Sequence, residues 1–149
     1  MKFLIPMLCV LPLVASCAGS PSKSDLDDEV RRLCAIDGGI RVYETVKLPA
    51  GLLDNYGGMR IPSKALAKVS DEFYYELDIH YYLKGNPEMS RSRYRIVRRS
   101  DSKVLGESTR YGRGGGDLPS PMHDSSFTCP VIGAKPSLED SVFLRENVK

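Results

Sequence analysis

The sequence predicts an α+β fold in which an N-terminal helix packs on an antiparallel β-sheet of four to six strands. Two patterns lead to this prediction. Between Ser24 and Gly38, apolar side chains recur at the spacing of one helix face. Over residues 73–84 they alternate with polar side chains, as in a strand with one buried and one solvated face. No internal repeat or heptad pattern competes with this interpretation.

Length and composition restrict the class of protein. The chain has 149 residues, of which 42% are hydrophobic and 27% are charged, and its formal net charge is +2. These values fit one small domain and exclude a fully disordered chain. So small a net charge gives no overall field suited to nucleic acid. No apolar run reaches the roughly 18 residues that a conventional membrane-spanning helix requires.

The predicted helix begins at Ser24, whose hydroxyl can cap a first turn that is rich in acidic side chains. Gly38 and Gly39 end the helix, and one of them is expected to have a positive φ. The side chains at positions i, i+4, i+7 and i+8 form the buried stripe: Leu26, Val30, Leu33 and Cys34.

Turns and loops rich in Gly, Pro, Asn and Asp separate the predicted strands. In the strand 73–84, the odd positions are assigned to the core and the even positions to solvent. The predicted strands cover residues 40–48, 73–84, 92–99 and 103–111, with shorter apolar segments at 127–129 and 142–144.

The first residues have the features of an export signal. Lys2 supplies a positive charge, and residues 3–14 form an apolar run that is too short to span a bilayer. The run ends in Leu13-Val14-Ala15-Ser16-Cys17, which resembles the lipobox of bacterial lipoproteins. The resemblance implies that residues 1–16 are a signal peptide and that Cys17 carries a lipid. An ordinary secretory signal with a coincidental cysteine is the alternative.

The lipobox also divides the mature chain. Residues 17–23 become a lipidated tether of small and polar residues, and residues 24–149 form a single α+β domain. Ala18 stands where inner-membrane lipoproteins carry Asp, so the resemblance implies the outer membrane, with the domain facing the periplasm. The sequence also resembles small bacterial lipoproteins, a resemblance that implies no specific activity, at residues 37–46, 84–89 and 114–119.

Four cysteines occur, and the leader accounts for two of them. Cys9 leaves with the signal peptide and Cys17 takes the lipid, so Cys34 and Cys129 remain. In the oxidising periplasm, such a pair predicts one disulfide, which closes the predicted fold. Two buried thiols are the alternative. Because no CxxC pair exists and only two histidines occur, the sequence predicts neither a metal site nor a cofactor.

Basic side chains dominate the segment 84–113, which holds nine basic and three acidic residues. This segment is a candidate site for an anionic envelope component or an envelope protein. Glu76 and Asp78 of the neighbouring strand can also neutralise its charge, and the sequence leaves both interpretations open. The predicted hairpin places four arginines on one side, which we call the arginine face: Arg91, Arg93, Arg95 and Arg99.

For function, the sequence favours a non-enzymatic binding or scaffolding module of the cell envelope, held at the membrane by its lipid and not bound to nucleic acid. An inhibitor of an envelope-attacking hydrolase is an alternative, because lysozyme-inhibitor lipoproteins are also small, rich in β-structure and closed by disulfides. A small hydrolase that uses His80 or His123 is a second alternative. Neither histidine belongs to a recognisable nucleophile motif, so no catalytic residue is predicted.

Overall fold

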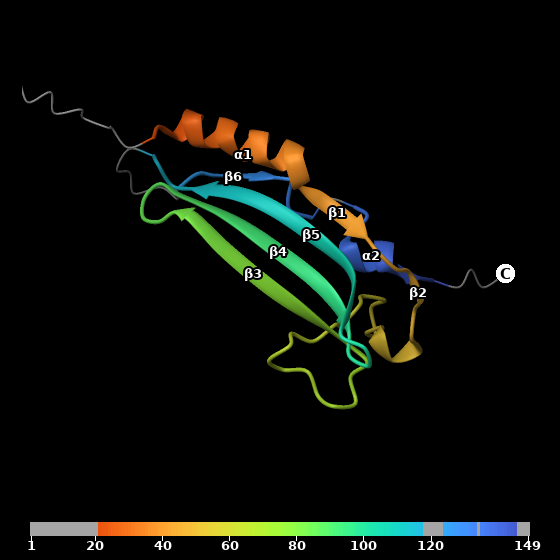
Figure 1. The fold of residues 1–149 in the computed structure, drawn as a ribbon. Helices are drawn as coiled ribbons and strands as arrows, with labels where there is room; N and C mark the ends of the chain where they lie inside the picture. Colours follow the sequence, from red (N-terminus) through yellow and green to blue (C-terminus); the bar gives the residue numbers. More distant parts are fainter. Residues whose placement is uncertain (1–20, 118–123, 134, 146–149) are drawn as a thin grey trace, which may run out of the picture.

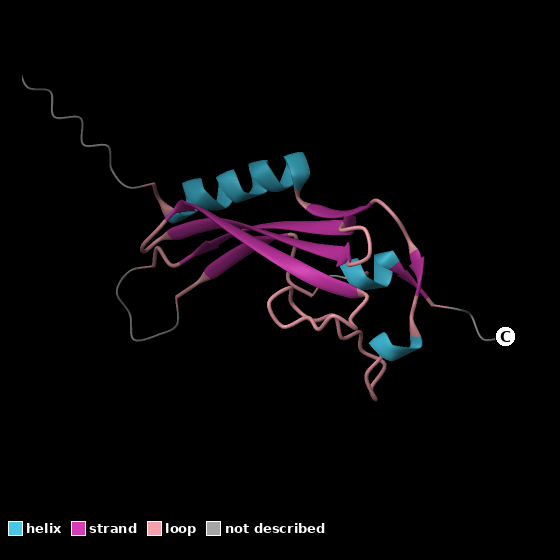
Figure 2. Ribbon diagram, turned by 60° about the horizontal axis from the view of Figure 1, so that its bottom comes forward, coloured by secondary structure: helices cyan, strands magenta, loops and turns pink. Residues whose placement is uncertain are grey.

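A computed structural model of the chain describes residues 21–117, 124–133 and 135–145. It shows the predicted α+β fold, with one main helix, α1 (Lys23–Asp37), packed on an antiparallel sheet (Figure 1). Figure 2 shows α1 on one side of the sheet and a short helix, α2 (Leu138–Val142), on the other. We call these sides the α1 face and the α2 face. Within the described residues, no helix has the length and apolarity needed to span a bilayer.

The sheet has five strands, within the predicted range. Its order is β1-β5-β4-β3, and β6 pairs with β5 on the edge that β1 also uses. All these pairings are antiparallel, whereas β2 and β7 form a separate parallel pair. The bounds are β1 (Gly39–Val42), β2 (Val46–Lys47), η1 (a 3₁₀ helix, Ala50–Leu52), β3 (Phe73–Leu83), β4 (Glu88–Arg98), β5 (Lys103–Gly114), β6 (Ser126–Cys129) and β7 (Phe143–Leu144).

Helix α1 is capped by Ser22, so the prediction of Ser24 as the cap is wrong. The Ser22 hydroxyl accepts a hydrogen bond from the Asp25 N–H (3.2 Å), and the Asp25 carboxylate accepts one from the Ser22 N–H (3.0 Å). This capping box satisfies both N–H groups. With Ser24 as the cap, the matching acid would be Asp27, whose carboxylate is already bound by Arg113 (2.8 Å). The helix therefore includes the last residue of the predicted tether.

The predicted strand 40–48 is two strands, because the chain bends in its middle. Tyr43 and Glu44 both donate their N–H groups to the carbonyl of Leu105, at 2.8 and 3.0 Å. The Glu44 carboxylate then binds Arg98 (2.6 Å) near the β4–β5 turn. The chain leaves the main sheet at this point, and β2 pairs with β7 instead.

Two apolar clusters form the core, one at each end of the sheet. On the α1 face, Leu26 and Val30 pack on Met89 of β4 and Tyr111 of β5. The second cluster lies around α2, on the other face and at the other end of the sheet. Each face of the sheet is therefore covered along only part of its length. That second cluster consists of Phe73, Ile96, Leu105, Leu138, Val142 and Phe143.

The predicted disulfide is present. Cys34 of α1 and Cys129 of β6 are bonded, with their Cα atoms 5.9 Å apart and 95 positions between them in sequence. Both cysteines pack against the apolar cluster of the α1 face. The bond therefore fastens the helix to the edge of the sheet.

The prediction that the odd positions of β3 are buried is wrong for the middle of the strand. Leu77, Ile79 and Tyr81 are 55%, 49% and 42% exposed. They lie on the α2 face, where α2 and its loops cover only the beginning of this edge strand. Beyond them, an irregularity in the β3–β4 pairing after Tyr81 brings Leu83 to the α1-face cluster.

Candidate functional site

The arginine face carries acidic partners for each of its strand arginines. The hairpin register places Glu76 opposite Arg95 and Asp78 opposite Arg93, as the sequence suggested. A further acid, Asp37, comes from the end of α1, which lies on this same face. The ion pairs are Arg91–Asp78 (3.2 Å), Arg93–Asp37 (3.9 Å), Arg93–Glu107 (3.9 Å) and Arg95–Glu76 (3.5 Å).

Arg99, the fourth residue of the arginine face, follows β4 and is held by the loop before β3. Its Nε donates a hydrogen bond to the carbonyl of Asp71 (2.7 Å). Its guanidinium lies over the ring of Tyr74, 5.4 Å from the ring centroid. All four arginines thus have partners within the chain. This arrangement favours a neutralised surface over an open anion site.

His80 is an exposed residue of β3, and its ring meets that of Tyr82 edge-on with 4.8 Å between the centroids. The nearby acid, Asp78, is engaged by Arg91. The other candidate base, His123, and the predicted lipid site, Cys17, lie outside the described residues. Across the described part of the chain, no three His, Cys, Asp or Glu side chains are grouped to hold a metal ion.

A different site lies on the α2 face, where a hollow of about 310 Å³ opens between the sheet and the segment that contains α2. Two cross-strand rows form its floor, because directly paired residues on adjacent strands point to the same side. We call it the Arg110 hollow. One row consists of Leu77, Tyr94, Ser108 and Ile40, and the next contains Ser92 and Arg110.

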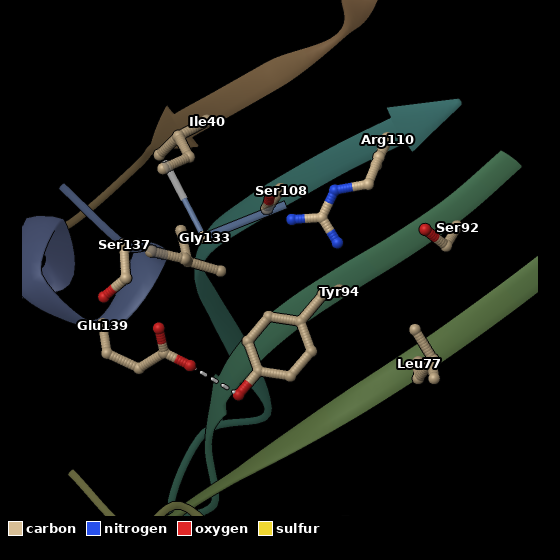
Figure 3. A pocket seen from close by; sticks show the side chains of 10 residues that line it. Ile40, Leu77, Ser92, Tyr94, Ser108, Arg110, Gly133, Ser137 and Glu139 are labelled. Atoms are coloured by element: carbon tan, nitrogen blue, oxygen red, sulfur yellow. Dashed lines mark hydrogen bonds between the residues drawn. The ribbon is translucent and has the colours of Figure 1, made fainter. Parts of the chain in front are cut away.

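Arg110 extends its guanidinium into this hollow (Figure 3). Its Nε is shielded from solvent and has no hydrogen-bond partner, and none of the described residues forms an ion pair with it. Arg95, by contrast, also has a shielded Nε but reaches Glu76 with its terminal nitrogen. The terminal nitrogens of Arg110 are not among the shielded, unpaired atoms, so the guanidinium, which is always charged, stays accessible within the hollow. An anion that entered the hollow would therefore be stabilised by Arg110.

Tyr94 and Glu139 form a second polar group in the same hollow. The Tyr94 hydroxyl donates a hydrogen bond to Glu139 Oε1 (2.9 Å), as Figure 3 shows. Burial, followed by the charge of Glu139, raises the pKa of Tyr94 well above its ordinary value. The hydroxyl therefore remains a donor, and the carboxylate remains its acceptor. The hollow holds one unpaired cation and one carboxylate that is already engaged.

Sequence reasoning missed Arg110 because it assigned the α2 face to the core. Arg110 lies within the predicted strand 103–111, and only the strand pairing shows what surrounds it. One signal was present in the sequence. Ser108 and Arg110 are consecutive residues on one face of β5, and Ser92 is polar on the paired strand, so this face carries too many polar side chains for a core.

The structure thus brings together the two cysteines predicted to bond and places Arg91, Arg93 and Arg95 along one side of β4. Unlike these three arginines, Arg110 has no hydrogen-bond or ion-pair partner among the residues that the structure describes. Comparisons of the chain with protein-family models, curated proteins and solved structures give no match.

Proposed function

We propose that this protein is a lipid-anchored, non-enzymatic binding module of the bacterial cell envelope that holds an anionic envelope component in the Arg110 hollow. The anchor follows from the lipobox at Cys17. One observation supports the binding role. The guanidinium of Arg110, unpaired among the described residues, lies in a hollow on the α2 face of the sheet.

The construction of the hollow supports ligand binding over a purely structural role. Its volume, about 310 Å³, is at the lower end of the range of roughly 300 to 1,000 Å³ typical of small-molecule sites. Such sites combine apolar walls with a few polar groups that orient the ligand. Here Ile40 and Leu77 supply the apolar surface, and Arg110 supplies the charge. The volume suits a small ligand, or the end of a larger one.

The lipid anchor is tested by metabolic labelling with a palmitate analogue. The wild-type protein should be labelled and sediment with the membrane fraction, and the Cys17→Ser variant should not be labelled. Equal labelling of both proteins would refute the anchor. This test decides where the protein is held and is independent of what it binds.

The binding role is tested by sedimenting the detergent-solubilised protein with purified cell wall that is free of lipid. The Arg110→Gln substitution should reduce sedimentation, and rising salt should reduce it in the wild type, because screening acts over about 8 Å near physiological salt. The matched control is Arg95→Gln, which removes a paired arginine from the opposite side of the sheet and should sediment like the wild type. Sedimentation that changes neither with salt concentration nor with the Arg110→Gln substitution would refute the proposal. Loss with Arg95→Gln alone would move the site to the arginine face.

A further inference from the structure

The charges of the Arg110 hollow limit the ligand to a single anionic group. Among the described residues that line it, Arg110 is the only cationic side chain, and Glu139 places a carboxylate in the same lining. A doubly charged phosphate would meet one guanidinium and would be repelled by Glu139. One carboxylate matches a guanidinium in the bidentate geometry that makes this pair strong. The hydroxyls of Ser92 and Ser108 lie near the guanidinium and can donate to the same carboxylate (Figure 3).

The other lining groups indicate what is attached to that carboxylate. Ile40 and Leu77 are 38% and 55% exposed, so an apolar side chain placed on them would be removed from water together with their surfaces. Glu139 accepts one hydrogen bond from Tyr94 and has further lone pairs, so it can accept an N–H from a ligand. The site therefore suits a carboxylate, an apolar side chain and an N–H group held close together.

We infer that the Arg110 hollow binds the free carboxyl end of a peptide whose last side chain is apolar, an inference that rests on the proposed function. The carboxylate pairs with Arg110, the apolar side chain lies on Ile40 and Leu77, and a peptide N–H faces Glu139. A fatty acid offers the carboxylate and the apolar chain but lacks the N–H. A phosphorylated ligand lacks the single charge that the lining favours.

The test is a titration of the full-length protein, in a non-ionic detergent, with alanyl-leucine, followed by NMR of the arginine Nε–H groups. Alanyl-leucine should bind and shift the Arg110 signal. Alanyl-leucinamide, which lacks the carboxylate, and octanoate, which lacks the N–H, should each bind at least tenfold more weakly. The comparison uses only the wild-type protein, so it does not depend on whether a variant folds.

Two variants complete the test. Arg110→Gln should weaken alanyl-leucine binding at least tenfold, whereas Arg95→Gln should leave it unchanged. Equal affinity for the acid and the amide would overturn the inference, and so would tighter binding of octanoate. If alanyl-leucine does not bind but Arg110 is still required for sedimentation with cell wall, the ligand class is wrong and the proposed function stands.

Discussion

Replacing Arg113 with methionine should destabilise the domain far more than replacing an exposed arginine. Arg113 is 2% exposed at its side chain and joins the beginning of α1 to the end of β5. Its Nε and Nη2 bind the carboxylate of Asp27 at 2.8 and 3.2 Å. Its Nη1 donates to the carbonyls of Gly115 and Ser125 at 2.8 and 2.9 Å. One side chain therefore satisfies a carboxylate and two carbonyls.

The magnitude follows from what the substitution leaves behind. Removing one partner of a buried ion pair costs about 3 to 5 kcal/mol, because the other charge stays buried. Asp27 is 18% exposed at its side chain, so water relieves part of this cost. We expect the free energy of unfolding to fall by about 3 kcal/mol, a large fraction of the roughly 5 to 15 kcal/mol that holds a domain of this kind together.

The assay is urea unfolding followed by far-UV circular dichroism, with linear extrapolation to water. The matched control is Arg32→Met, because Arg32 binds Glu29 at an equally short 2.7 Å but both side chains are largely exposed. That control should unfold like the wild type. In an Asp27→Asn background, Arg113→Met should cost less than in the wild type. If Arg113→Met costs less than about 1 kcal/mol, the stabilising role assigned to this buried pair is wrong.

Three further predictions concern packing, pH and the disulfide. Gly106→Ala should lower the free energy of unfolding by about 1 to 3 kcal/mol in urea unfolding, because the added Cβ would lie 2.9 Å from Val142 Cγ2. Gly51→Ala, where nothing lies within 4 Å, should be tolerated. An NMR titration should place the pKa of Asp101 at about 2, chiefly because Arg98 hydrogen-bonds to it, and Arg98→Met should return it towards 3.8. Because the folded-state pKa is lowered, this pair adds stability above the unfolded pKa and loses it as the pH falls towards 2. Reducing the disulfide, which spans 95 positions, should lower the free energy of unfolding in the same assay by up to about 4 to 5 kcal/mol.

The features predicted correctly from the sequence are those that depend on local pattern or covalent chemistry. The alternation over residues 73–84 predicted β3. The turn that follows leads into β4 and sets the register in which the two strands pair. The disulfide followed from counting cysteines. The cap of α1 was misplaced by two residues because Ser22 and Ser24 are equally good caps in isolation. The contact that separates them, Arg113 with Asp27, joins residues 86 positions apart.

Alternation predicts that a strand has two faces but does not say which face the rest of the chain covers. The alternation alone predicts that the apolar face of β3 lies in the core. Met89 and Tyr111 decide which face α1 covers. They lie on the same side of the sheet as the arginines and pack under Leu26 and Val30 of α1. Once α1 lies there, the opposite side is covered at one end only, by the α2 region and by apolar side chains from residues 46–61. Arg91, Arg93 and Arg95 on the α1 face gain acidic partners, and Arg110 on the α2 face does not.

The position of the anchor relative to the Arg110 hollow bears on which component could reach it. Four residue steps separate Cys17 from Pro21, the first described residue, and a fully extended chain of that length reaches about 14 Å at most. A lipid on Cys17 would therefore keep the beginning of α1 close to the membrane surface. The β3–β4 turn lies at that same end, where Asn86 accepts a hydrogen bond from the N–H of Gly116, and α2 lies towards the other end (Figure 1). The Arg110 hollow is built against the α2 segment, so in the proposed arrangement it is displaced from the membrane. A ligand would then approach from the periplasm, which agrees with a peptide end of the cell wall better than with a lipid headgroup of the anchoring membrane.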